Sequence, residues 1–282
     1  MKQVQWFPGH MVKARRQVEE KLGVIDIVFE LLDARAVISS MNPDIPSIIK
    51  NKPRLLILNK ADLADPNVTK SWIQYFQSQG LQAVSSDATQ DDLLPIIKPV
   101  VEQILAPLRE KERKKGMKDR PIRVMVLGIP NVGKSQFINR LSNRNKTKTG
   151  DKPGITKIQQ YLRIGDHFEI LDNPGILWHK FEDPMVGLKL ALLGSIKDEI
   201  LPLDDLVLFG IHYLKERYPS LLKDKYKSLS NEDEEILAAI GRSRGVLQKG
   251  GTIDYERVMK LFLFDLRNGK LGRISYDRVE SD

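Results

Sequence analysis

The sequence predicts an α/β fold of three layers, followed by a smaller all-α domain. Up to Gly175, short apolar and β-branched runs alternate with helical patterns, and this alternation is typical of a parallel sheet covered by helices on both faces. After Gly175 these runs stop, and only helical patterns follow. We therefore expect one domain over residues 1–178 and a separate helical domain over residues 179–282.

The expected strands of the first domain are apolar runs that end in polar or turn-forming residues. They are residues 24–32 (VIDIVFELL), 54–58 (RLLIL), 81–84 and 122–127 (IRVMVL), followed by a hairpin at 161–164 and 168–171. Helical patterns lie between them at residues 15–20, 69–79, 93–108 and 134–141. The basic stretch 109–120 is the best candidate for a linker.

The helices of the second domain are predicted from residues that cap or open helices. Asp and Ser act as N-caps, and proline is tolerated at the first helical position. The four expected helices begin near Pro184, Pro202, Ser230 and Asp254. We expect the first to continue through Ile200 and the last to end at Gly269.

The composition excludes several classes of protein. The chain has 282 residues, of which 41% are hydrophobic and 29% charged, and it lacks the roughly 18 consecutive apolar residues of a membrane span. It contains no cysteine, which excludes disulfides, thiol catalysis and cysteine-ligated zinc. The first ten residues have no apolar secretory segment. We expect a cytoplasmic protein with no membrane partner.

The net charge of +8 is concentrated in three stretches of the chain. Residues 104–123 carry eight basic and three acidic side chains, residues 140–152 carry five and one, and residues 241–278 carry nine and four. Clustered Lys and Arg are typical of proteins that bind a polyanion. Solvated helix faces and linkers give the same pattern, so charge alone does not choose between the two.

Residues 128–135 (GIPNVGKS) match the phosphate-binding pattern G-x-x-x-x-G-K-S between an expected strand and an expected helix. The glycines let backbone N–H groups surround a phosphate, and the helix N-terminus favours negative charge. Lys134 is expected to reach the β- and γ-phosphates. The nucleotide contacts expected from this P-loop are Asn131, Val132, Gly133, Lys134, Ser135 and Gln136.

Asn59, Lys60 and Asp62 form the pattern N-K-x-D, which selects guanine. The aspartate pairs with the N1–H and the exocyclic amine of guanine, whereas adenine has an acceptor at N1 and no amine at C2. We therefore predict GTP and GDP as substrate and product. The usual third guanine loop is present only weakly, at Ser86, Asp87 and Ala88.

A magnesium site is predicted from hydroxyl and carboxylate side chains. Asp172 and Gly175 form the pattern D-x-x-G, in which the aspartate holds a magnesium-bound water and the glycine amide meets the γ-phosphate. Thr156, in the segment PGIT, supplies a hydroxyl that can close on Mg²⁺. Ser135, Thr156 and Asp172 are the expected magnesium ligands.

The order of these motifs is unusual, because N-K-x-D precedes the P-loop. In this the chain resembles the circularly permuted GTPases, and most closely the bacterial ribosome biogenesis GTPase A group. The resemblance covers essentially the whole chain and rests on WFPGHM at 6–11, DAR at 33–35, NKAD, GIPNVGKS, PGIT and the segment D-x-PGILW at 172–178. It implies a circularly permuted P-loop GTPase fold. One departure is Asn173, where the family usually has threonine; because this residue binds neither metal nor phosphate, we expect a modest effect.

The residue that positions the attacking water is not evident from the D-x-x-G motif. Many GTPases have a glutamine after it, but here Ile176 stands there and cannot bind water. The resemblance points to His10 as a catalytic residue beside Lys134, since an imidazole polarises water near neutral pH; a structural role for His10 is the alternative. Asn131 matches the K⁺ ligand of potassium-dependent relatives, which implies K⁺ activation.

The resemblance and the basic stretches together favour a GTP-hydrolysing assembly factor for the large (50S) ribosomal subunit. We expect it to bind the pre-subunit and its rRNA with GTP, to leave after hydrolysis, and to be a monomer off the ribosome. The segment after D-x-x-G leads directly into the second domain, so movement of this switch can reorient that domain. The second domain resembles a small RNA-binding antitermination-type domain. Its candidate phosphate contacts are Arg242, Arg244, Lys249, Arg257, Lys260, Arg267, Lys270 and Arg273.

Two alternatives stay open on the sequence alone. Ile176 favours an RNA-binding structural factor whose nucleotide pocket is occupied but catalytically idle. The other alternative is a GTP-dependent regulator of tRNA modification or of a membrane process, for which the chain offers no membrane anchor.

Overall fold

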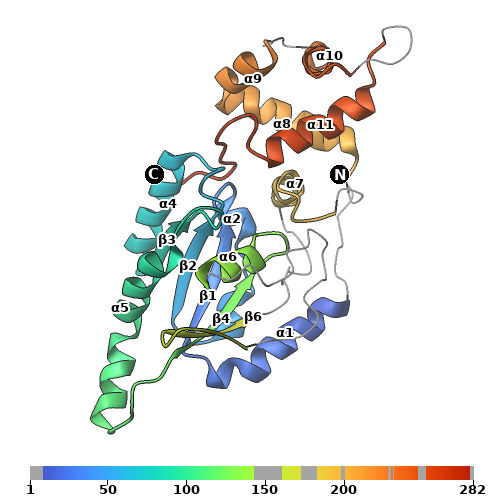
Figure 1. The fold of residues 1–282 in the computed structure, drawn as a ribbon. Coiled ribbons are helices and arrows are strands. Elements are labelled where there is room, and N and C mark those ends of the chain that lie inside the picture. Colours follow the sequence, from blue (N-terminus) through green and yellow to red (C-terminus); the bar gives the residue numbers. More distant parts are fainter. Residues whose placement is uncertain are drawn as a thin grey trace.

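The structure, a computed structural model, describes residues 9–142, 161–172, 183–197, 201–227, 230, 232–246 and 252–279. Within these ranges, side chains are described from residue 15 onward, apart from those of Tyr161 and Asp172. A sheet with helices on both faces forms the first part of the chain, and a helical bundle lies beyond one end of that sheet (Figure 1).

The described sheet has six strands in the order β3-β2-β1-β4-β6-β5. The strands are β1 (Ile27–Asp33), β2 (Arg54–Asn59), β3 (Gln82–Ser86), β4 (Ile122–Gly128), β5 (Tyr161–Ile164) and β6 (Phe168–Asp172). Neighbouring strands are parallel except for β5 and β6, which form the predicted antiparallel hairpin. All seven residues of β1 are buried, as its continuous apolar run predicts for a central parallel strand.

Helices cover both faces of this sheet, which confirms the predicted three layers. Successive side chains of a strand point to opposite faces, so Phe29 packs with helices α5 and α6, whereas Val28 packs with α1 and α3 and Leu32 with α4. The ring of Phe29 meets Phe137 of α6 edge to face, with 6.4 Å between the ring centroids. The helices of this part are α1 (Gly9–Lys21), α2 (Val37–Ser40), α3 (Ile45–Ile49), α4 (Pro66–Ser78), α5 (Leu93–Lys114) and α6 (Lys134–Leu141).

Several sequence-based boundaries differ from the structure, and two of them were wrong in a way that affects the expected linker and the bundle. Helix α5 continues through Lys114, so the first half of the expected linker is helical; its Lys, Arg and Glu residues are good helix formers, and Glu110 pairs with Lys114 one turn later. The expected helix through Ile200 ends at Leu192 instead. Gly194 adopts a left-handed conformation (φ 72°) just beyond this end, which is a common way for helices to stop.

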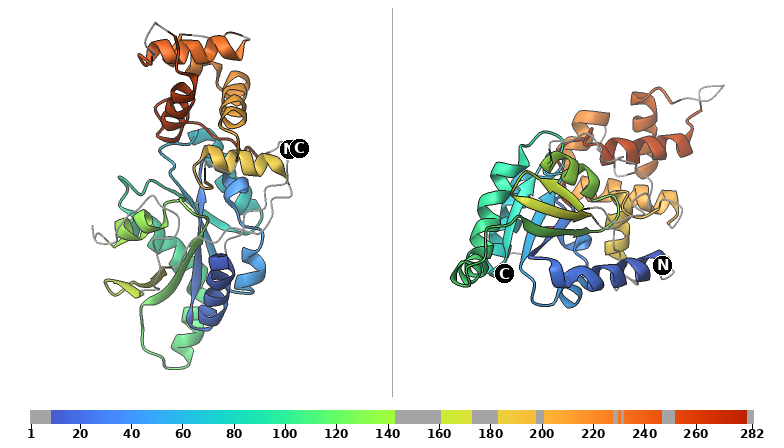
Figure 2. Two further views of the ribbon diagram at one scale, coloured as in Figure 1. Left: turned by 90° about the vertical axis from the view of Figure 1, so that its right-hand side faces the viewer. Right: turned by 60° about the horizontal axis from the view of Figure 1, so that its bottom comes forward.

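The helical bundle lies beyond the carboxyl ends of the parallel strands (Figures 1 and 2). Its described helices are α7 (Pro184–Leu192), α8 (Leu203–Arg217), α9 (Pro219–Tyr226), α10 (Asp233–Ser243) and α11 (Tyr255–Arg267). The sequence predicted four helices here and missed α9, which begins two residues after the end of α8. Ligands of open parallel α/β sheets bind outside the carboxyl ends of the strands. The bundle therefore stands beside the edge at which the sequence predicts the nucleotide.

After α11 the chain returns to the first domain as a segment of residues 269–279, which we name the C-terminal segment. Asp277 anchors it: the Asp277 carboxylate accepts hydrogen bonds from the amide and hydroxyl of Ser39 in α2 at 2.7 and 3.0 Å, and pairs with Lys189 of α7 at 2.7 Å. The indole N–H of Trp72 in α4 donates to the Asp277 carbonyl at 3.2 Å. Sequence reasoning predicted no role for this segment in the first domain. Across the described ranges, no helix has the length and apolar character to cross a bilayer.

Candidate nucleotide-binding site

The P-loop connects β4 to α6 through two positions that only glycine can occupy without strain. Gly128 and Gly133 have φ values of 155° and 95°. A Cβ on Gly128 would lie 2.7 Å from the Leu31 carbonyl oxygen, and one on Gly133 would lie 2.5 Å from Nδ2 of Asn59. The Lys134 ammonium group lies within hydrogen-bond distance of the Gly128 and Ile129 carbonyls, at 3.3 and 3.2 Å, and is thereby held against the loop. This backbone cradle at a helix N-terminus fits a polyphosphate.

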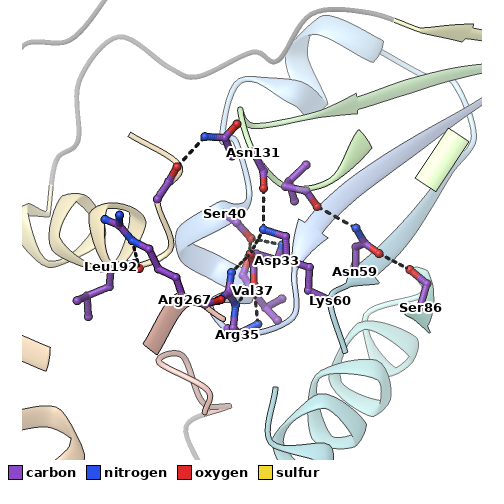
Figure 3. A network of polar contacts seen from close by, with 12 residues as sticks. Asp33, Arg35, Val37, Ser40, Asn59, Lys60, Ser86, Asn131, Leu192 and Arg267 are labelled. Carbon is purple, nitrogen blue, oxygen red and sulfur yellow. Dashed lines mark hydrogen bonds and ion pairs between the residues drawn. The ribbon is translucent and has the colours of Figure 1, made fainter. Parts of the chain in front are cut away.

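The predicted guanine loop is joined directly to the P-loop. Asn59, at the end of β2, is buried; its amide Nδ2 donates to the Val132 carbonyl at 2.9 Å, and its Oδ1 accepts from the Ser86 hydroxyl at 2.9 Å (Figure 3). The guanine loop, the P-loop and the weakly matching loop at Ser86 therefore meet at the Asn59 side chain. Parallel pairing of Asn59 with Ser86 at the ends of β2 and β3 brings them together. Motif order along the chain does not matter to this geometry, because the sheet places the strand ends side by side.

A buried charge cluster that the site prediction omitted holds the lysine of the same loop. Lys60 Nζ donates to the Asn131 carbonyl at 2.7 Å and lies 3.2 Å from the Asp33 carboxylate. Asp33 also accepts from Arg35, at 2.9 Å from Nε and 2.8 Å from Nη2 (Figure 3). Burial opposes ionisation of Asp33, but the charges of Arg35 and Lys60 prevail and hold its pKa well below the usual range. The D-A-R sequence at the end of an apolar strand was the available signal for this cluster.

A cavity of about 200 Å³ lies between these loops and the helical bundle. It is lined by the guanine-loop residues Asn59, Lys60, Asp62 and Leu63, by Asp87, Ala88, Thr89, Gln136 and Arg35, and by Leu193 and Arg267 from the bundle. Burial and the nearby Asp87 carboxylate raise the pKa of Asp62, whereas Arg35 and Arg273 act in the opposite direction. A larger hollow of about 610 Å³ is lined by Asp62, Asp87 and Arg273 together with residues of α4.

The magnesium side of the site is described in part. Ser135 lies in the first turn of α6, and Asp172 ends β6, where register pairing sets it beside Val126 of β4. The P-loop strand and the Asp172 strand therefore end at the same edge, as a site for Mg²⁺ and phosphate requires. His10 lies in helix α1, and its side chain is outside the described residues, as is that of Asp172. Thr156 and Gly175 lie outside the described residues entirely.

The helical bundle contacts the P-loop directly. Asn131, with a left-handed φ of 58°, donates from its side-chain amide to the Gly194 carbonyl at 2.8 Å. Gly194 follows α7, and the Arg267 guanidinium at the end of α11 donates to the Leu192 carbonyl at 3.1 Å (Figure 3). It also donates to the Ala191 carbonyl at 2.8 Å. The proposed K⁺ ligand and the ends of two bundle helices thus share one contact region.

Three of the candidate RNA contacts use their guanidinium groups within the protein. Arg244 pairs with the buried Asp265 at 2.7 Å, Arg267 caps α7, and Arg273 donates to the Asp62 carbonyl at 2.9 Å. Such groups stabilise the bundle and the guanine loop, and RNA contact would require them to bind two partners.

The other candidates differ in their surroundings. Arg242 and Arg257 are exposed, as is Lys260, which pairs with Glu256. Lys270 is exposed with its Nζ 4.5 Å from the ring centroid of Phe264, which is itself 49% exposed. Lys249 lies outside the described residues. Exposed cations beside an exposed aromatic ring form a surface suited to phosphate and base contacts.

Comparison with known proteins agrees with this geometry. A family model described as "50S ribosome-binding GTPase" matches residues 123–244, a range that begins in β4 just before the P-loop. Ribosome biogenesis GTPase A of Bacillus licheniformis is 48% identical over 280 residues, which covers 98% of this chain and 99% of that protein. The chain belongs to the ribosome biogenesis GTPase A family. The protein of that name from Thermotoga maritima is 32% identical, over 98% of this chain and 94% of its own length.

Solved structures are similar to this family member over nearly its whole length. A GDP-bound structure described as "TM YlqF" has a TM-score of 0.66 and 28% identity, and covers 94% of this chain and 100% of that one. A GNP-bound YlqF from T. maritima has a TM-score of 0.64 and 29% identity. The predicted fold and family are confirmed, and the chain is a GTPase that acts on GTP and yields GDP.

Proposed function

We propose that this GTPase is an assembly factor for the large ribosomal subunit. In its GTP-bound form it binds the pre-subunit and its rRNA, and it leaves after GTP hydrolysis. The observation that carries the proposal is that the bundle contacts the predicted nucleotide site: the Asn131 side chain of the P-loop donates to the Gly194 carbonyl, and Leu193 and Arg267 line the cavity beside the guanine loop. Nucleotide exchange at this cavity therefore acts on the bundle without an intermediary. The family model's description, which names 50S ribosome binding, supports the large subunit as the target.

The site residues have these proposed roles. Asp62 would accept hydrogen bonds from guanine. Lys134 would neutralise charge on the β- and γ-phosphates, and the Gly175 amide would donate to the γ-phosphate. Ser135, Thr156 and Asp172 would hold Mg²⁺. Mg²⁺ fits because a P-loop hydroxyl and a strand-end aspartate reach the same edge of the sheet.

Two further parts of the proposal concern the rate of hydrolysis. His10 would position the attacking water, and Asn131 would hold K⁺, whose positive charge would offset negative charge that develops on the phosphates during hydrolysis. The hydrogen bond from the Asn131 side-chain amide to the Gly194 carbonyl fixes the orientation of this side chain, so the bundle determines where its Oδ1 atom points. Turnover should be faster in KCl than in NaCl at equal ionic strength, and equal rates in the two salts would remove K⁺ from the mechanism.

We place the protein with ribosomal precursors in the cytoplasm as a monomer, and the test of the function is co-sedimentation. The full chain is run through a sucrose gradient with precursors of both the large and the small subunit, in the presence of a non-hydrolysable GTP analogue or GDP. The proposal predicts co-migration with the analogue and loss of binding with GDP. Identical profiles would contradict a GTP-dependent switch, and co-migration with the small subunit would contradict the target.

RNA contact has its own test within the same gradient. Lys270→Ala removes an exposed cation beside Phe264, and Lys111→Ala removes a cation from α5, which lies on the sheet and not on the bundle. We expect Lys270→Ala to lower the affinity for the ribosomal precursor and to reduce the dependence of that affinity on salt concentration, because each phosphate contact releases counterions. Equal binding by the two variants would exclude this face of the bundle.

A further inference from the structure

We infer that the C-terminal segment positions the guanine loop, with Arg273 as the residue that holds Asp62 in place for guanine. The inference rests on the proposed placement of guanine against Asp62. It makes base recognition depend on a segment that follows the helical bundle and lies far from the N-K-x-D motif in the sequence.

Two consecutive residues of the segment bind three consecutive carbonyls of the guanine loop. The Arg273 side chain donates from Nε to the Asp62 carbonyl at 2.9 Å, and its Nη2 lies 3.5 Å from the Ala61 carbonyl. The Ile274 amide donates to the Leu63 carbonyl at 3.0 Å. This pattern fixes the backbone on both sides of the Asp62 side chain.

Hydrogen bonds within the guanine loop involve the Lys60 and Ala61 carbonyls, whereas the Asp62 and Leu63 carbonyls bind the C-terminal segment. The Leu63 and Ala64 amides donate back to the Lys60 and Ala61 carbonyls, at 3.0 and 3.3 Å, which forms a turn. The carbonyls of Asp62 and Leu63 point out of the turn to their partners in the segment. A turn secured on one side only would let the Asp62 carboxylate move relative to the base.

The segment is itself held firmly, so it can act as a support. Ser275 accepts from the Asp65 amide at 3.1 Å, and the Tyr276 amide donates to the Arg35 carbonyl. Ile274, Ser275, Tyr276 and Asp277 are all buried. At its start, a Cβ on Gly269 would lie 2.6 Å from the Leu63 side chain, which shows how closely the segment approaches the loop.

Charge acts in the same direction as the hydrogen bonds. Asp62 must be ionised to accept two hydrogen bonds from guanine, whereas burial and Asp87 raise its pKa. Arg273 and Arg35 lower the pKa of Asp62 and so favour the ionised form. Arg35 in turn donates from Nη1 to the Arg267 carbonyl at 3.0 Å, which links this charge to the end of α11.

The test compares fluorescent GDP and IDP, because inosine lacks the exocyclic amine that Asp62 recognises. Arg273→Ala should weaken GDP binding about tenfold, the equivalent of one lost hydrogen bond to a charged group. The ratio of GDP to IDP affinity should fall toward one, because Asp62 is no longer held in position to recognise the exocyclic amine of guanine. Arg273→Lys, which keeps the charge, should be intermediate.

The matched control is Arg278→Ala, which makes the same change of side chain in the same segment. Arg278 is exposed and donates to the Tyr218 hydroxyl at 2.9 Å, whereas the guanine-loop carbonyls are bound by Arg273 and Ile274. We expect unchanged GDP affinity and an unchanged GDP to IDP ratio. Arg273 is exposed, so its variants are expected to fold, and an unaltered melting curve checks this for each.

A double-mutant cycle separates this inference from the nucleotide site on which it rests. In an Asp62→Ala background, Arg273→Ala should have no further effect on GDP affinity, because its action passes through Asp62. An unchanged ratio in Arg273→Ala, or an equal loss in both backgrounds, would overturn the inference. If Asp62→Ala alone leaves GDP affinity intact, the proposed guanine site itself is wrong.

Discussion

Replacing Asp33 by Asn tests the buried charge cluster beneath the guanine loop. The carboxylate is fully buried and accepts three hydrogen bonds from Arg35, from its amide at 3.1 Å, from Nε at 2.9 Å and from Nη2 at 2.8 Å. Lys60 lies 3.2 Å away. The change keeps the size of the side chain, removes its charge, and leaves Arg35, which is 3% exposed, without its counter-ion.

The expected loss of stability is large. Breaking a buried ion pair from one side costs about 3–5 kcal/mol, because the remaining charge stays buried without compensation. This is a substantial part of the roughly 5–15 kcal/mol by which a folded protein is stable. The sign of its pH dependence follows from the depressed pKa of Asp33: its stabilisation is present above the unfolded pKa of about 3.9 and is lost as the pH falls.

Urea unfolding followed by circular dichroism measures this loss as a shift of the midpoint at constant slope. Asp166→Asn is the matched control, because Asp166 pairs with Arg163 at the surface, where the two side chains are 92% and 63% exposed. We expect the control to cost less than about 1 kcal/mol. A loss for Asp33→Asn no greater than that of the control, or one that does not shrink toward low pH, would refute the reasoning.

Three further predictions concern single residues. Burial raises the pKa of Glu30 to about 7 although Arg54 opposes the shift, so the stabilisation by Glu30 is present below the unfolded pKa of about 4.3 and is lost as the pH rises through 7. Urea midpoints measured between pH 5 and 8 should show the wild type losing up to about 3 kcal/mol relative to Glu30→Gln, and parallel pH profiles of the two proteins would contradict this prediction. Gly133→Ala should weaken GDP binding at least about tenfold by displacing Asn59, whereas Gly116→Ala, with open space around its Cβ, should not; equal affinities in fluorescence titrations would disprove the cradle. His10→Ala should lower ribosome-stimulated turnover at unchanged GDP affinity, and unaltered turnover would exclude His10 from catalysis.

The sheet and the motif positions were predictable because they depend on local patterns. An apolar strand that ends in polar residues is typical of a parallel α/β sheet, and β1, β2 and β4 follow this pattern closely. The end of α7 was also open to prediction, since Gly194 is a common helix stop.

Other features depend on contacts between distant residues. Arg273 was predicted as a phosphate contact from its charge, but it bonds to Asp62, 211 positions earlier in the chain. Similarly, Asp277 meets Ser39 and Lys189 through the path of the C-terminal segment. Composition and spacing along one chain contain no information on such pairs, because they are created only when the bundle leads the chain back onto the first domain.

The central claim is that a guanine loop placed before the P-loop in the chain forms one site with it. Asp62→Asn tests this most directly, measured as the affinities for GDP and for xanthosine diphosphate in a fluorescence titration. Asparagine cannot accept both hydrogen bonds of guanine, but its amide can donate to the oxygen that xanthine carries at C2. We predict a loss of GDP affinity of at least about a hundredfold and a gain for xanthosine diphosphate. Unchanged GDP affinity, with no gain for the xanthine nucleotide, would contradict the account.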